Sequence, residues 1–312
     1  MSRYTSVHVL LFAVWGFCNL AKAQPFVTGE VGFSNDSDGF QTNSLSAGIG
    51  RYMSDENFYD RIGYKHSSMN FSAPGLSMHG NSDSLFGGKA FSSPIGPING
   101  EFELGKINLP ANVRTIGSVQ VSGQPTRAVN YEVRDERNIV ESFNGLNNRV
   151  TYSSRTFAID YQFTPLINIA GVLGQLNFSD QNKRMLWKAK ATYVLSEEKG
   201  IRTYFKSTRY SNSVPYTGNY FSPASFQDYQ IGFGFRRRLS ILRGVLSGYA
   251  EAGSQSADSV NSPIHGEQIK LEAFPNRPWH YDVSIGIQTS AGTSGGANYE
   301  YRYAKASVVW PF

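Results

Sequence analysis

Residues 298–312 read NYEYRYAKASVVWPF and end the chain on an aromatic residue. Successive side chains of a β-strand point to opposite faces. Counted back from the terminus, one face carries only apolar residues: Phe312, Trp310, Val308, Ala306 and Ala304. The opposite face is mostly polar and carries Tyr301, Tyr303, Lys305, Ser307 and Val309. This two-residue rhythm predicts a closing strand with one face for an apolar environment and one for water.

The first 23 residues have the layout of a secretory signal. Arg3 supplies an early positive charge, residues 9–17 form a short apolar run, and small residues stand at Ala21 and Ala23. The run is too short for a helix that crosses a bilayer. We therefore expect residues 1–23 to be a cleaved signal peptide and residues 24–312 to form one domain. The only cysteine, Cys18, lies in this signal, so no disulfide is expected.

The composition limits the class of protein that remains. Only 17% of the residues are charged, the mean hydropathy is −0.34, and the chain contains 31 Gly, 21 Phe and 18 Tyr. No apolar run after the signal is long enough for a membrane helix, which excludes a helical membrane protein. A membrane β-barrel fits this composition, because half of each strand faces a polar lumen.

The remaining sequence is a series of alternating segments separated by turn-rich breaks. We count about fifteen breaks, among them residues 81–83, 123–125, 180–182 and 212–223. This count predicts an all-β fold, a transmembrane antiparallel up-and-down barrel of about 16 strands, within a range of about 14 to 18.

The alternation also predicts which residues face the lumen. In the segment 226–238, Tyr229, Ile231 and Phe233 alternate with polar residues and glycines. A Lys or Arg that faced lipid at the bilayer midplane would cost about 2–4 kcal/mol, so the charged positions are assigned to the lumen. The predicted lumen-lining residues are Glu101, Glu103, Asp160, Lys188, Lys190, Arg202, Tyr204, Lys206, Asp228, Arg236, Arg238, Tyr249, Glu251, Lys270, Glu272, Asp282 and Lys305.

Two interpretations of these residues remain open. The simpler one is that they only solvate the wall of a pore. The sharper one is that carboxylates, cations and tyrosine rings form a track for a neutral or weakly charged sugar chain. Many weak polar and aromatic contacts would let a polymer slide without binding tightly.

The end of the chain resembles the closing strand of bacterial outer-membrane β-barrel proteins. The resemblance rests on the terminal Phe312 and on the apolar residues Val308 and Trp310 before it. It implies that these residues form the signal read by the barrel-assembly machinery, and that the last strand pairs with the first. It also implies a location in the outer membrane of a Gram-negative bacterium, among its lipids and lipopolysaccharide.

Three internal runs resemble the C-terminal barrels of synthase-dependent exopolysaccharide exporters of the cellulose and poly-N-acetylglucosamine type. They are VNYEVRDERNIVESFNGLNN (129–148), NFSDQNKRMLWKAKATYVL (177–195) and NYFSPASFQDYQIGFGFRRRL (219–239). The most telling pieces are residues 178–182 and 220–223. Each also suits local structure, because Asp180 and Asn182 favour a tight turn and Pro223 can end a loop.

This second resemblance implies a pore that exports a polysaccharide. Exporters of this family carry helical repeats before the barrel, and residues 24–312 leave no room for them. The resemblance therefore implies that the periplasmic helical-repeat scaffold is a separate protein or is absent. The expected partners are such a separate scaffold and an inner-membrane polysaccharide synthase. The alternatives are a general or substrate-specific diffusion porin and a structural or adhesive surface barrel.

Other classes find little support in the sequence. The positive charges are scattered and form no nucleic-acid motif. The histidines after the signal, His66, His79, His265 and His280, are dispersed, which argues against a metal site. Ser67, Ser68 and Asn70 follow His66, but neighbours on a strand alternate between faces and do not form a catalytic chain readily. We expect no enzyme activity and no cofactor.

Overall fold

The computed structural model describes residues 24–52, 59–73, 76–94, 96–109, 112–274, 279–289 and 299–312. The predicted signal peptide, residues 1–23, lies outside these residues. No helix in this part of the chain is long and apolar enough to cross a membrane.

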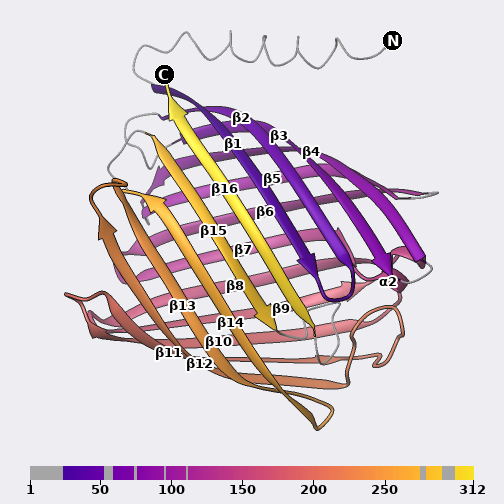
Figure 1. Cartoon of the computed structure of the whole chain (residues 1–312). Coiled ribbons are helices and arrows are strands. Elements are labelled where there is room, and N and C mark those ends of the chain that lie inside the picture. Colours follow the sequence, from indigo (N-terminus) through magenta and orange to yellow (C-terminus); the bar gives the residue numbers. More distant parts are fainter. Residues whose placement is uncertain are drawn as a thin grey trace, which may run out of the picture.

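The described residues form one closed sheet of antiparallel strands (Figure 1). The strands are β1 (Gln24–Asp36), β2 (Phe40–Tyr52), β3 (Tyr59–Ala73), β4 (Leu76–Ser93), β5 (Gly96–Leu109), β6 (Asn112–Thr126), β7 (Val129–Ile139), β8 (Thr151–Thr164), β9 (Ile167–Phe178), β10 (Lys183–Ser196), β11 (Ile201–Asn212), β12 (Ser225–Leu239), β13 (Gly244–Ala257), β14 (Val260–Ala273), β15 (His280–Thr289) and β16 (Glu300–Pro311). Each strand pairs with its neighbours in sequence, and β16 closes the barrel against β1. One short helix, α2 (Phe143–Asn147), lies between β7 and β8.

The closing pair joins the two ends of the predicted barrel. Val27 lies opposite Trp310, and Gly29 lies opposite Val308. Closure leaves no unpaired strand edge, which is the condition for a sheet to sit in lipid. The predicted sixteen-stranded up-and-down barrel, with its last strand paired to its first, is confirmed.

Two of the predicted breaks were wrong, because they lie inside strands. Residues 81–83 belong to β4, where Asn81 accepts a hydrogen bond from Asn108 at 2.9 Å and Asp83 meets His66 Nδ1 at 2.8 Å. These cross-strand contacts satisfy polar side chains that would otherwise favour a turn. Residues 123–125 belong to β6, and the strand continues to Thr126.

The outer face of the barrel is a band of exposed apolar side chains. Leu173 is 63% exposed, and Ile231 and Phe233 are each 59% exposed. In a soluble protein such a surface would drive association, whereas lipid accommodates it. Val308, Trp310 and Phe312 lie on this outer face, with 43%, 58% and 64% of their surfaces exposed.

The two ends of the barrel can be told apart by the features that lie at each of them. Gln24 and Pro311 lie at one end, which we call the proximal end, and the odd-numbered strands run from it to the distal end. The helix α2 and the connection 213–224 both follow odd-numbered strands, so they lie at the distal end (Figure 1).

Candidate functional site

The strand register brings all seventeen predicted lumen residues to one face of the sheet. Paired residues share a face, so the assignment can be followed from strand to strand, for example from Lys305 to Ser284 and on to Lys270. When register partners are followed around the whole barrel, every predicted lumen residue lies on the same face of the sheet as Lys305. Trp310 lies on the opposite face. The helix α2 packs on this same face, which is therefore the interior. That the interior forms a water-filled path through a membrane stays a prediction.

One wall of the interior carries a network of the predicted residues. Lys206 Nζ lies 2.5 Å from Glu251, which also accepts a hydrogen bond from the Tyr204 hydroxyl at 2.8 Å. Both contacts cross β12 at Gly232, where an added Cβ would lie 2.2 Å from the Tyr204 ring. Glycine is required there because the ring occupies the place of a side chain.

A second network continues from β12 to β15. Lys270 lies 2.9 Å from Glu272 and 2.6 Å from Asp282, and Arg236 lies 3.2 Å from Glu272. Tyr249 packs edge-on against Tyr204 at 6.3 Å between ring centroids.

The opposite wall pairs predicted residues with partners that the sequence reasoning missed. Glu101 meets Arg61 at 2.6 Å, Glu103 meets Lys65 at 3.6 Å, and Lys305 meets Glu30 at 2.7 Å. The same alternation could have identified Arg61, Lys65 and Glu30, since each has an interior position in its strand.

Four predicted cations remain outside these pairs. Among the described residues, Lys188, Lys190, Arg202 and Arg238 form no ion pair, although Lys190 Nζ lies 4.0 Å from the centre of the Tyr204 ring. Asp160 accepts a hydrogen bond from Asn168 at 2.9 Å. Asp228 is 3% exposed and accepts a hydrogen bond from the Thr208 amide at 2.7 Å.

At the distal end, α2 is held against the strands on one side of the barrel. Leu146 packs in a buried cluster with Phe40, Phe71 and Ile107, and the Phe143 ring lies 5.1 Å from that of Phe71. The helix therefore extends from its own strands, β7 and β8, to β2 and β3.

On the other side, the connection 213–224 is anchored to the turn between β9 and β10. The Tyr220 ring stacks on Phe178 at 4.4 Å, and its hydroxyl donates to Asp180 at 3.2 Å. Asn182, 1% exposed, donates to the same hydroxyl at 3.0 Å and to Asn212 at 3.1 Å. These buried contacts fix the connection inside the barrel.

Arg184 completes this anchor. It is 2% exposed, donates to Asn212 at 3.0 Å and to the Phe221 carbonyl at 2.6 Å, and lies 4.4 Å from the centre of the Tyr210 ring. Carbonyl oxygens and aromatic faces therefore balance its charge in place of a carboxylate.

The helix and the connection join to form what we call the distal bridge, α2 together with residues 213–224. Ser142 donates to the Asn219 carbonyl at 2.5 Å, and Asn144 donates to the Gly218 carbonyl at 2.8 Å. Asn148 donates to the Asn219 side chain at 2.8 Å. Contacts thus run from β2 through the bridge to β10, and these strands are eight places apart in a ring of sixteen. The bridge crosses the barrel along its diameter.

The three runs that resemble exporter barrels meet at the distal bridge and at its anchor on the turn between β9 and β10. Residues 129–148 supply α2, residues 177–195 supply Asp180 and Asn182, and residues 219–239 supply Tyr220. Asp180 and Asn182 form a turn, as their types suggest, but they also hold a segment about 40 residues away. No feature of the sequence alone indicates this contact.

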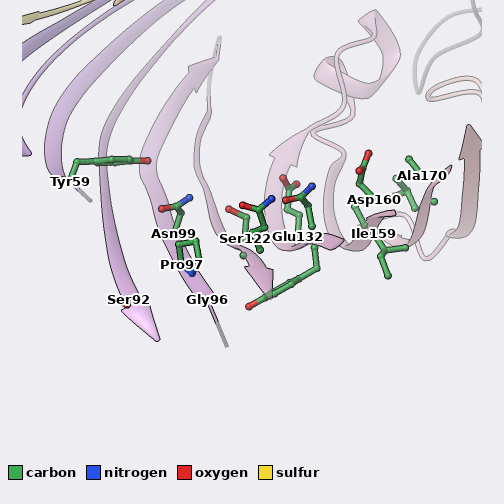
Figure 2. A pocket seen from close by; sticks show the side chains of 17 residues that line it. Tyr59, Ser92, Gly96, Pro97, Asn99, Ser122, Glu132, Ile159, Asp160 and Ala170 are labelled. Carbon is green, nitrogen blue, oxygen red and sulfur yellow. The ribbon is translucent and has the colours of Figure 1, made fainter. Parts of the chain in front are cut away.

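Cavities lie along the interior at both ends. The cavity near the proximal end has a volume of about 830 Å³ and is lined by Glu132, Asp160, Asn99 and Tyr59 (Figure 2). A smaller cavity of about 390 Å³ lies against the distal bridge and is lined by Phe143, Tyr220 and Glu141, among other residues.

Glu141 stands at the distal bridge with other carboxylates near it. Its side chain reaches water, yet enclosure by the barrel and the charges of Asp36 and Glu136 raise its pKa to about 7. In an unfolded chain the carboxyl would have an ordinary pKa near 4.5. Between pH 4.5 and about 7, the folded state therefore binds a proton that the unfolded state has mostly released. The stability of the folded state rises as the pH falls from about 7 toward 4.5.

Glu141→Gln should remove this pH dependence. The wild-type barrel is expected to unfold at a temperature a few degrees higher at pH 5.5 than at pH 8, a modest shift because water screens the exposed group. The variant should unfold at nearly the same temperature at both pH values and be the more stable protein at pH 8. The measurement is the loss of the fast-migrating folded band on gels of samples heated in steps. An unchanged pH dependence in the variant would contradict this account.

The histidine that a hydrolase would need lies on the outer face. His66 Nδ1 contacts Asp83 at 2.8 Å, and Asp83 also accepts a hydrogen bond from Tyr64. No described serine is hydrogen-bonded to this histidine. No group of three His, Cys, Asp or Glu residues in the described ranges could hold a metal ion.

Comparisons with known proteins find the same fold in solved structures. The chain is similar to a solved structure titled "Bacterial polysaccharide outer membrane secretin", with a TM-score of 0.67 and 13% identity over 93% of this chain and 98% of the other. Matches to Pseudomonas aeruginosa OccK7 (OpdD) and OccD3 (OpdP) have TM-scores of 0.46 and 0.45 and identities of 9% and 6%. They cover 94% of this chain in both cases, and 99% and 92% of the other chains. No protein-family model and no curated protein match the sequence. At these identities the similarity shows the fold.

Proposed function

We propose that this chain is an outer-membrane pore through which an exopolysaccharide leaves the cell. The observation that carries the proposal is the distal bridge. The three runs that resemble exporter barrels are far apart in sequence, and they meet at this one place in the interior. The segments that resemble exporter barrels are therefore the ones that shape the distal end of the barrel interior.

The chemistry of the interior supports a saccharide as the passing molecule. Carboxylates and cations alternate as ion pairs on both walls, and the rings of Tyr204 and Tyr249 lie among them. Sugar hydroxyls exchange hydrogen bonds with such groups, and sugar faces stack on aromatic rings. Because the contacts are many and individually weak, a polymer could be held in line and still move.

The solved structure with the same fold adds support of a different kind. That protein is described as a polysaccharide outer-membrane secretin, and its chain matches this barrel over nearly its whole length. The partners we propose are outer-membrane lipid and lipopolysaccharide, the barrel-assembly machinery, a periplasmic helical-repeat scaffold and an inner-membrane synthase.

A diffusion porin, general or substrate-specific, is the second candidate, and one observation favours it. The distal bridge crosses the full diameter of the barrel, which restricts the opening that a bulky polymer would need. Small solutes pass such a constriction more easily than chains. Export therefore requires that the bridge leave a gap or move.

A deletion strain tests the export function directly. In conditions where the gene is expressed, its loss should abolish most of the extracellular polysaccharide measured by staining and by sugar analysis, and the wild-type gene on a plasmid should restore it. Polymer output equal to wild type would overturn export. Steady conductance of the purified protein for small solutes would then support the porin.

A further inference from the structure

One cavity in the interior differs from the others in its charge. It has a volume of about 430 Å³, lies between β9 and β12, and is lined by Arg184, Lys188, Lys190 and Lys206, with Asp228 as its one acidic residue. The proximal cavity, in contrast, is lined by Glu132 and Asp160 and by no lysine or arginine.

Two lysines in this cavity are free to meet a ligand. Lys206 is paired with Glu251, and Arg184 is committed to Asn212 and the Phe221 carbonyl. Lys188 and Lys190 have exposed side chains and no ion pair among the described residues. They lie two positions apart on β10, so both ammonium groups point into the interior.

The acidic residue of the cavity does not neutralise them. Asp228 is 3% exposed, and its carboxylate accepts hydrogen bonds from the Thr208 amide at 2.7 Å and from Gln230 at 3.5 Å. No ion pair joins Asp228 to Lys188 or Lys190 in the described part of the chain. The cavity therefore keeps an excess of positive charge.

An unpaired hydroxyl in the same cavity is the second observation that points to a ligand. The Tyr210 side chain lines the cavity and is 8% exposed, and its buried hydroxyl has no hydrogen-bond partner among the residues that the structure describes. Leaving such a group unpaired costs about 1–3 kcal/mol, a cost that a bound acceptor would remove. An anionic oxygen is the acceptor that the lysines would bring to it.

The neighbouring strand provides a floor for a sugar ring. Ala170 and Val172 on β9 lie opposite Lys190 and Lys188 in the register, and both line the cavity. Beyond this floor stand Asp160 and Glu132, which line the proximal cavity together with the same two β9 residues. A ring on the floor would have cations on one side and hydroxyl-binding carboxylates on the other.

We infer that Lys188 and Lys190 form a binding site for an anionic group on a saccharide, such as a carboxylate, with Tyr210 as a further hydrogen-bond donor. The inference rests on the proposed passage of a saccharide and specifies its chemistry. The track would then take a polymer that carries at least some negatively charged substituents.

The experiment compares an anionic with a neutral trisaccharide. Purified full-length protein in a planar lipid bilayer is exposed to trigalacturonate or to maltotriose, and the reduction of the current is measured. Isothermal titration of the protein in detergent gives the affinities independently of conductance. We expect trigalacturonate to act at concentrations about tenfold lower than maltotriose, which corresponds to about 1.4 kcal/mol.

The variants assign the effect to this cavity. The variant with Lys188→Gln and Lys190→Gln should bind trigalacturonate about tenfold more weakly than the wild type and bind maltotriose with unchanged affinity. Tyr210→Phe should weaken the binding of trigalacturonate about threefold. Lys270→Gln with Lys305→Gln is the matched control, since it also removes two positive charges from the interior but at paired positions. Its effect on trigalacturonate should stay below about twofold.

Two results would overturn the inference. One is equal action of the two trisaccharides on the wild-type protein. The other is a loss of trigalacturonate affinity in the variant with Lys270→Gln and Lys305→Gln as large as that in the variant with Lys188→Gln and Lys190→Gln, which would show general charge attraction and no site. Failure of export is a separate result, because it is measured as polymer outside cells and leaves the trisaccharide data standing.

Discussion

Phe157→Arg is expected to destabilise the barrel in a bilayer by about 2–4 kcal/mol. Phe157 lies near the middle of β8 on the outer face, is 44% exposed, and has Val133 and Leu173 as its register partners. A guanidinium at this depth would meet lipid chains, and the outward-facing acid of the neighbouring strand, Asp135, is already paired with Arg155 at 2.9 Å. Its long side chain could reach water only by distorting the bilayer.

The next residue in the same strand is the matched control. Ala158 points to the interior, lines the proximal cavity and has Glu132 as its register partner, so Ala158→Arg should be tolerated or stabilised by a new ion pair. Both variants are refolded into phospholipid vesicles, and the free energy of unfolding is measured in guanidinium chloride. If the two substitutions had equal effects, the assignment of faces that underlies the pore would be wrong.

The faces were predictable because alternation is a local property. Once Trp310 is assigned to the outer face, alternation along the strand assigns Lys305 to the interior. The same reasoning within their own strands assigns Glu101 and Lys270 to the interior, without any knowledge of the neighbouring strands. Strand number was predictable for a related reason, since most turns carry their own glycines, prolines or asparagines. The predicted number of strands was still correct, because the misplaced break at residues 81–83, a polar stretch inside β4, was counted in place of the connection between β3 and β4.

Partners across the interior were not predictable in this way. Whether a lysine is paired depends on which residues the register places two strands away, as when Lys206 reaches Glu251 across Gly232. The sequence placed Lys188 and Lys206 on the same face but gave no reason to treat one as paired and the other as free.

The distal bridge was out of reach for the same physical reason. Asp180, Ser142 and Asn219 each have a sufficient local explanation in turn, cap or loop chemistry. Their contacts with one another exist because closure of the barrel brings β7, β9 and β11 around a common interior. When a residue makes both a local and a long-range contact, a single sequence reveals only the local one.

Shortening the connection 213–224 is expected to raise the single-channel conductance about threefold or more. Replacing residues 214–222 by a Gly-Ser-Gly linker removes Gly218 and Asn219, which receive the hydrogen bonds of α2, and Tyr220, which anchors the connection. The bridge would then lose its half on the side of β10. A barrel of this strand number has a wide aqueous lumen when no segment crosses it, and conductance grows with the open cross-section.

A matched change at the proximal end separates this effect from general disturbance of the barrel. Among the described residues, the turn 197–200 between β10 and β11 makes no hydrogen bond with the distal bridge, so its replacement by Asn-Gly should leave the conductance unchanged within experimental error. Both proteins must first show the folded band on unheated gels. A folded protein with the shortened connection and wild-type conductance would mean that the bridge does not limit flow. The pore would then be open beside it, and export would need no movement of the bridge.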